Sequence, residues 1–217
     1  VQVDGLLSVY TSNNGNIIFN ANGNLDAVEV DTETLNLVAT NGRVVLGTVG
    51  DSVPFASLDI DADSDGSVGV GGAAAELNGN ITVTGVITFA GSPNVDLSGD
   101  VSVTSSGAGD ITFGTAVTDD IDGPFALQIT NTSGDVTLRQ AGNNIPLDSL
   151  SVTTQNGTVN LDGTVDTTGH IDIDSSTALT IDLAVTSAGG DIDLTGATVT
   201  TTDVTGTITT AGDINID

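Results

Sequence analysis

The chain has 217 residues and a formal net charge of −27, because 29 acidic residues are set against two basic ones, Arg43 and Arg139, and a single histidine. With so few cations nothing neutralises phosphates, which excludes nucleic acid as a partner and disfavours an anionic membrane surface. The sequence has no cysteine, which excludes disulfides and thiolate sites, and it shows no apolar run long enough to insert into a membrane.

The composition predicts an all-β protein with almost no helix. Five Phe, one Tyr and no Trp are present, while Val, Ile, Leu, Ala and Thr abound, and such side chains suit a thin β interior. The acidic residues are nearly all Asp, with Glu29, Glu33 and Glu76 as the only glutamates, which favours turns and outward strand positions over helices. Since methionine is also absent, we expect a processed product, an expressed fragment or one segment of a longer chain.

The N-terminal part already shows a repeat, although with looser spacing than the rest. Residues 7–15 closely echo residues 150–157. Residues 54–60 match residues 146–152, and in both segments a proline precedes a strand, where its missing N–H does least harm to a ladder. The repeat therefore spans the chain.

Two segments, 71–75 and 119–123, interrupt the rhythm and are predicted to be loops. Neither is long enough to be a linker. Residues 1–217 are therefore predicted to form one domain.

The sharpest local motif is an alternating acidic run closed by a glycine turn, in which Asp61, Asp63 and Asp65 follow Asp59. Alternating carboxylates of this kind can surround one hard cation, so the four aspartates are a candidate Ca²⁺ site. An EF-hand would place Glu at the twelfth position of the loop, where this chain has Gly72. The alternative is a solvated acidic turn. A weaker candidate of the same kind combines Asp119, Asp120 and Asp122.

In the C-terminal half an alternating polar and apolar pattern returns at nearly constant spacing. Its centres are Ile129, Leu150, Ile171, Ile192 and Ile214, at steps of 21, 21, 21 and 22 along the chain. A second series is interleaved with the first at steps of 23, 22 and 23, through Val136, Val159, Ile181 and Val204. Inward side chains recurring at this period predict a parallel β-solenoid of about ten coils of roughly 20–25 residues.

A glycine leads each of the clearest strand units and is expected to supply positive φ at a corner. These glycines are Gly79, Gly99, Gly109, Gly134, Gly157, Gly169, Gly190 and Gly212.

The predicted register stacks acidic residues on the outside of the coils. His170, Asp191 and Asp213 would form one row, and Asp172, Asp193 and Asn215 a second. Carboxylates about 5 Å apart repel by roughly 1 kcal/mol in water. Either cations bridge these rows, or they form a solvated acidic face screened by salt.

The irregular repeats of about twenty residues, the Gly-Asp-Ile/Val strand starts and the Thr/Asn/Gly-rich turns resemble the β-helix shafts of filamentous haemagglutinin-like bacterial surface proteins. The resemblance covers nearly the whole chain. It implies an extracellular, surface-exposed shaft or fibre subunit, with an adhesive role attached, whose partners are copies stacked end to end or a longer parent chain. The chain departs from that family in having no lysine and no recognisable secretion or cap domain.

Functions other than a shaft are less well supported by the sequence. No enzymatic activity is expected, because cleavage of acidic polysaccharides needs clustered cations, and His170 lies at an outward position. Paired carboxylates for glycoside hydrolysis stay open. The alternative to a shaft is a calcium- or glycan-binding surface module. An ice-binding threonine array is a further alternative, drawn from Thr198, Thr200, Thr202, Thr207 and Thr209.

Overall fold

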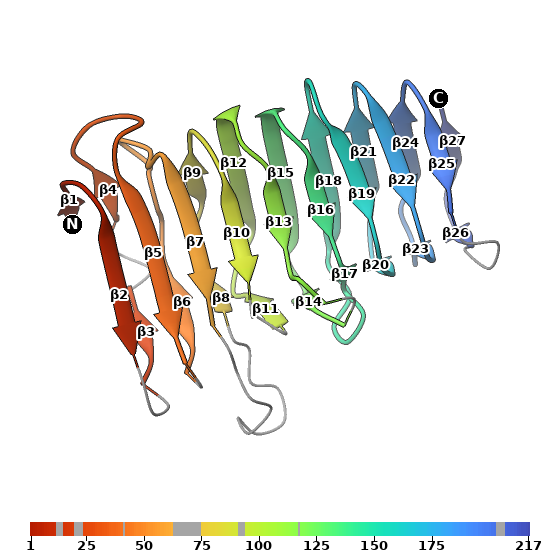
Figure 1. The fold of residues 1–217 in the computed structure, drawn as a ribbon. Coiled ribbons are helices and arrows are strands. Elements are labelled where there is room, and N and C mark those ends of the chain that lie inside the picture. Colours follow the sequence, from red (N-terminus) through yellow and green to blue (C-terminus); the bar gives the residue numbers. More distant parts are fainter. Residues whose placement is uncertain are drawn as a thin grey trace.

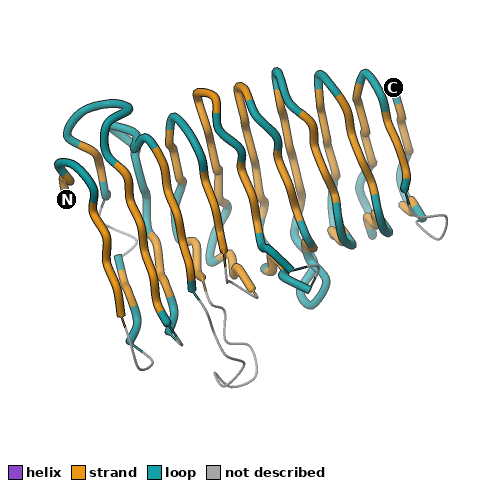
Figure 2. Tube along the Cα trace, in the orientation of Figure 1, coloured by secondary structure: helices purple, strands orange, loops and turns teal. Residues whose placement is uncertain are grey.

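A computed structural model describes residues 1–11, 15–19, 24–40, 42–62, 75–90, 94–116, 118–202 and 207–217. These residues form 27 short strands and no helix, so none of them builds a helix that could cross a membrane. The strands wind into a single column with the two termini at opposite ends (Figures 1 and 2). The predicted parallel β-solenoid is confirmed.

Three parallel sheets, here named sheets I, II and III, form the faces of the column. Sheet I contains β2 (Leu7–Thr11), β5 (Thr34–Ala39), β7 (Ser57–Asp61), β10 (Ile87–Ala90), β13 (Ile111–Phe113), β16 (Val136–Leu138), β19 (Thr158–Leu161), β22 (Ala178–Ile181) and β25 (Val199–Thr201).

Sheet II lies next along each coil. It contains β3 (Ile17–Ile18), β6 (Val44–Leu46), β8 (Ala75–Leu77), β11 (Asn94–Leu97), β14 (Asp120–Asp122), β17 (Gln140–Ala141), β20 (Val165–Thr167), β23 (Val185–Ser187) and β26 (Ile208–Thr210).

Sheet III forms the third face from β9 onward. It contains β9 (Ile81–Val83), β12 (Val101–Ala108), β15 (Ala126–Ser133), β18 (Ser149–Thr154), β21 (Ile171–Ser175), β24 (Ile192–Gly196) and β27 (Ile214–Ile216). A separate two-stranded pair, β1 (Gln2–Val3) with β4 (Asp26–Ala27), lies near the N-terminal end.

The column has about eight turns, fewer than the ten expected. Paired inward side chains of sheet I mark the length of each coil, from Leu7 opposite Leu35 at one end to Leu179 opposite Val199 at the other. The successive steps between these partners along the chain are 28, 23, 29, 24, 25, 23, 20 and 20. The coils are thus shortest and most regular toward the C-terminus.

The predicted register is confirmed in part. Leu150, Ile171, Ile192 and Ile214 do stack, but Leu150 pairs with Leu127 on its other side, and Ile129 pairs with Val152. A slip of two positions keeps every side chain on its face, so alternation alone cannot detect it.

The second predicted series slips in the same way. Val136 pairs with Val159, but Val159 then pairs with Leu179, and Ile181 with Leu161. Val204 lies outside the described residues.

Two other expectations from the sequence are corrected. The segments 7–15 and 150–157 resemble one another, but the strands they contribute, β2 and β18, lie on sheets I and III, as do β7 and β18 of the second matched pair, because all three sheets use the same inward and outward alternation. The predicted loop 119–123 is wrong, since Asp120–Asp122 is strand β14 of sheet II. Most of the loop predicted at 71–75 lies outside the described residues, and β8 begins at Ala75.

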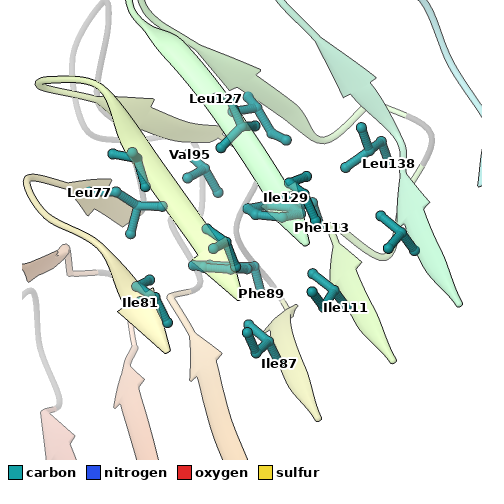
Figure 3. Packing of buried hydrophobic residues seen from close by; sticks show 14 of the residues in the cluster. Leu77, Ile81, Ile87, Phe89, Val95, Ile111, Phe113, Leu127, Ile129 and Leu138 are labelled. Atoms are coloured by element: carbon teal, nitrogen blue, oxygen red, sulfur yellow. The ribbon is translucent and has the colours of Figure 1, made fainter. Parts of the chain in front are cut away.

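The interior is a continuous stack of apolar side chains (Figure 3). Phe89 and Phe113 occupy the same position in consecutive coils, with ring centroids 4.5 Å apart and planes 9° from parallel. Each fully buried large side chain contributes about 1.5–3 kcal/mol relative to leaving it exposed. The core rather than any single bond therefore holds the coils together.

The glycines that precede the strands are needed for close packing of the coils more often than for a backbone with positive φ. Of the eight predicted to adopt positive φ, only Gly134 does so. A Cβ on Gly157 would lie 1.8 Å from the carbonyl oxygen of Gly134, and one on Gly190 would lie 2.3 Å from the carbonyl carbon of Gly169. Consecutive coils thus touch through their backbones at these corners.

Inward hydroxyl groups complete the same corners. The Ser175 hydroxyl donates to the carbonyls of Gly157 at 2.9 Å and Ala178 at 2.7 Å, and the Ser187 hydroxyl donates to Gly169 at 2.6 Å. Both side chains are buried. They satisfy carbonyl groups that the ladders leave unpaired where the chain turns.

Candidate functional site

The predicted calcium site falls partly on β7. Asp59 and Asp61 both point outward from this strand, and Asp63 and Asp65 lie outside the described residues. Burial, followed by the charge of Asp61, raises the pKa of Asp59. Within the described ranges no three acidic, histidine or cysteine side chains are grouped as a metal site. The four-aspartate site therefore stays a prediction.

One predicted acidic row lies on sheet III, and the other lies at the corner just before its strands. Asp172 pairs with Asp193 and Asp193 with Asn215. Burial, followed by the charges of Asp193 and Asp174, raises the pKa of Asp172, while the Asn215 amide donates a hydrogen bond to Asp193. Repulsion along this row is thus relieved at its end by a neutral amide.

The row of His170, Asp191 and Asp213 has a structural role at a corner. The backbone N–H of Asp191 donates to His170 Nδ1 at 3.1 Å, and that of Asp213 donates to Asp191 Oδ1 at 3.0 Å. His170 therefore does here what aspartate does elsewhere, since Asp110 Oδ1 accepts from the N–H of Asp135 and Asp135 Oδ1 from that of Thr158. Much of the acidity of the chain serves to join one coil to the next.

The weaker acidic candidate becomes a buried carboxylate pair. Asp120 and Asp122 are 2% and 3% exposed on β14, because residues 142–146 of the next coil cover them. The Asn144 amide donates to both carboxylates at 3.1 Å, and the N–H of Ile145 donates to Asp122 at 2.9 Å. Burial, followed by the charge of Asp122, raises the pKa of Asp120 to about 7.

Asp119, the third member of that candidate, is engaged separately. Its Oδ2 accepts the backbone N–H groups of Thr115 at 2.7 Å and Ala116 at 2.8 Å. It closes a turn rather than joining Asp120 and Asp122 around an ion.

An acidic file continues from this pair along sheet II. Asp96 lies opposite Asp122 and Glu76 lies opposite Asp96. Burial, followed by the charges of Asp122 and Glu76, raises the pKa of Asp96. Burial also acts to raise the pKa of Glu76, but hydrogen bonds from Ser98 and Asn78 and the charge of Arg43 lower it overall.

Both guanidinium groups are already paired with carboxylates. Arg43 lies 2.7 Å from Glu76, and Arg139 forms an ion pair with Asp162. The two arginines therefore lie on different coils and do not come together as a cationic cluster.

The predicted threonine array does not form a single face. Thr200 lies on β25 of sheet I, whereas Thr209 lies on β26 of sheet II. A different threonine column runs along sheet III, where Thr82, Thr104, Thr130 and Thr153 stack before Asp174 interrupts them. The sequence did not reveal this column, because its members recur at the uneven steps of 22, 26 and 23 along the chain.

A groove on the outer face of sheet III was also missed. It is lined by Asn80, Asp100, Val101, Ser102, Ala126, Leu127, Gln128, Ser149 and Ser151. Small polar residues scattered between Asn80 and Ser151 give no motif that sequence inspection could recognise.

Comparison of the chain with models of protein families, with curated proteins and with solved structures found no match. The likeness to filamentous haemagglutinin-like proteins therefore rests on the repeat pattern, and the fold alone agrees with it.

Proposed function

We propose that this chain is a rigid shaft of an extracellular fibre, and that its stacked coils give the fibre length and stiffness. The observation that carries the proposal is the continuity of the ladders: nine strands in sheet I, nine in sheet II and seven in sheet III are joined in unbroken parallel order. From β9 onward, the coils are held by their neighbours on three faces at once. Such a column resists bending because any bend must open ladder hydrogen bonds on one face.

The exposed end of the column supports stacking of a further coil. Ile214 and Ile216 lie over Ile192 and Leu194, which are fully buried, yet they are themselves 45% and 50% exposed. Large apolar side chains in the register of the core are covered in a solenoid by the next coil. A following coil, from a continuing chain or a second copy, would bury them.

The surface charge fits a fibre that must not clump sideways. The net charge is −27, and both arginines are paired, so each column presents a repulsive surface to its neighbours. The extracellular location follows from the same proposal. An adhesive role would lie at sites on the shaft, and no catalytic role is part of the proposal.

Electron microscopy of the purified chain, with calcium and again after chelation, tests the proposal. Rods that extend into unbranched filaments are expected for the wild type. In a double variant, Ile214→Lys with Ile216→Lys, charge on the exposed end should stop growth at single rods, and Thr137→Lys on the outer face of sheet I is the matched control. Single rods for the wild type in both conditions would refute end-to-end stacking. Flexible or collapsed particles would refute the rigid shaft itself.

A further inference from the structure

The outer face of sheet III carries a groove of about 430 Å³ across β12, β15 and β18. Its volume lies within the range of about 300–1,000 Å³ typical of small-molecule sites. Four of the side chains that line it are small, those of Ser102, Ala126, Ser149 and Ser151. It lies on strands held by ladders on both sides, so its floor is preformed.

The floor of this groove is uncharged along the column axis. Register places Ser102 opposite Gln128 and Gln128 opposite Ser151. The next residue in the same file is Asp172, followed by Asp193. The groove is therefore a neutral segment of a file that turns acidic in the following coil, in a protein whose net charge is −27.

Four polar side chains of the groove are not used by the rest of the described chain. Ser102, Ser149 and Ser151 have hydroxyl groups, and Gln128 an amide, for which the described part of the chain supplies no hydrogen-bond partner. Two other lining groups are engaged: Asn80 Oδ1 accepts the N–H of Ser102 at 2.9 Å, and Asp100 Oδ1 accepts that of Ala126 at 3.0 Å. The one carboxylate that lines the groove, Asp100, is thus already hydrogen-bonded at a corner. The lining groups without a partner among the described residues are neutral donors and acceptors.

We propose that the groove binds a neutral, linear glycan lying along the column axis. Hydroxyl and amide groups repeat here once per coil, about every 4.8 Å, close to the length of one sugar in an extended β-linked chain. Successive coils can therefore meet successive sugars with the same kind of hydrogen bond.

Other ligand classes fit less well. A peptide strand has no free sheet edge to pair with on this face, because β12, β15 and β18 are each bonded on both sides. A divalent cation would find one carboxylate, and an anionic glycan would meet no cation in the groove and repulsion from the rest of the surface. The glycan site does not depend on end-to-end stacking of the columns, so each of the two proposals can fail without the other.

Titration of the ¹⁵N-labelled chain with neutral hexasaccharides, followed by NMR, tests the inference. The probes are cellohexaose, mannohexaose and chitohexaose, with hexagalacturonate as the anionic comparison. Saturable shifts confined to residues around Ser102, Gln128 and Ser151 are expected with at least one neutral probe. No saturable shift with any of the three at millimolar concentration, or a preference for hexagalacturonate, would overturn the proposal.

Ser151→Asp gives a variant that the fold already tolerates, since Asp172 and Asp193 occupy the same file. The new charge should weaken binding of the neutral probe by about tenfold. Thr137→Asp is the matched control on sheet I, where Asp59 stands in the equivalent file, and it should bind within about twofold of the wild type. Equal affinity of Ser151→Asp and the wild type would place binding elsewhere and refute the groove.

Discussion

Aspartate has several roles in this chain, and its place relative to a coil corner separates two of them. At a corner, as with Asp135, the carboxylate accepts the first N–H of the next coil and stays exposed. On the strand β14, the same residue type is covered by a following loop and shares the donors of that loop. The acidic composition is therefore partly structural and is not in itself a sign of metal binding.

Asp135 provides a test of the corner role. Its own N–H donates to Asp110 Oδ1 at 2.9 Å and its Oδ1 accepts the N–H of Thr158 at 2.8 Å, so it links three coils. Asp135→Ala should lower the free energy of unfolding by about 1 kcal/mol, measured by urea denaturation. Asp135→Asn should stay close to the wild type, because Asn80 fills this role at its own corner. Equal losses in both variants would point to charge instead of hydrogen bonding.

Asp120 provides a test of the buried pair through pH. Its carboxyl is protonated below about pH 7 in the folded state but only below about 3.8 when unfolded. Between these values the folded state binds more protons, so stability falls as pH rises through this window, and the penalty is complete above about 7.

Asp120→Asn removes that ionisation while keeping an acceptor for the N–H of Asn143. The melting temperature of the variant should exceed that of the wild type at pH 8, and the difference should shrink toward pH 4. Asp4→Asn, at an exposed position outside the strands, serves as the control and should show a much smaller difference between the two pH values. A difference independent of pH would show that Asp120 does not take up a proton on folding.

At the scale of the strand and its turn, close backbone contact is the main constraint. Gly157→Ala would bring a Cβ within 1.8 Å of the Gly134 carbonyl oxygen and should destabilise the protein by about 2–3 kcal/mol. Gly99→Ala meets no atom within 4 Å and should change stability by less than about 0.5 kcal/mol. Urea denaturation of the two variants gives the comparison, and similar losses would contradict the packing argument.

The alternation in the sequence was enough to predict the regular strands and their inward faces, but not β14, whose outward residues are covered. Ile192 and Leu194 are buried and Asp193 points outward, as the pattern indicates. The register was predictable only to within two positions, since Ile129 opposite Leu150 and Ile129 opposite Val152 bury the same faces. The uneven coil lengths remove the constant period that would have settled it, since a coil of sheet I advances the chain by as little as 20 and by as much as 29.

The candidate sites were less predictable than the strands because they combine several coils. The burial of Asp120 depends on Asn144, which lies in the next coil within a loop of no distinctive sequence. The groove of sheet III depends on small side chains from Ser102 to Ser151. The composition shows that the protein is acidic, but it does not show which carboxylates are buried.

At the scale of the whole molecule, stability should depend on salt. The net charge of −27 makes the column repel itself, and screening reduces this repulsion. The melting temperature should therefore rise with NaCl concentration, as followed by circular dichroism. A melting temperature unaffected by salt would mean that the corner hydrogen bonds already compensate the repulsion.

The predicted calcium site gives a separate measurement under the same conditions. At matched ionic strength, CaCl₂ should raise the melting temperature beyond the effect of NaCl, and a chelator should reverse the difference. Asp59→Asn with Asp61→Asn should abolish it, whereas Asp172→Asn should not. Identical melting temperatures in the two salts would refute the calcium site and favour an ordinary acidic turn.

The change in coil length along the column has a consequence for assembly. The coil from Leu7 to Leu35 near one end is longer than the coil from Leu179 to Val199 at the other, so the two ends differ in perimeter. Identical copies joined head to tail would meet with a ledge at every junction. With about eight coils at about 4.8 Å each, such a filament would vary in width with an axial repeat of about 38 Å, and a filament without this repeat would exclude head-to-tail stacking of identical copies.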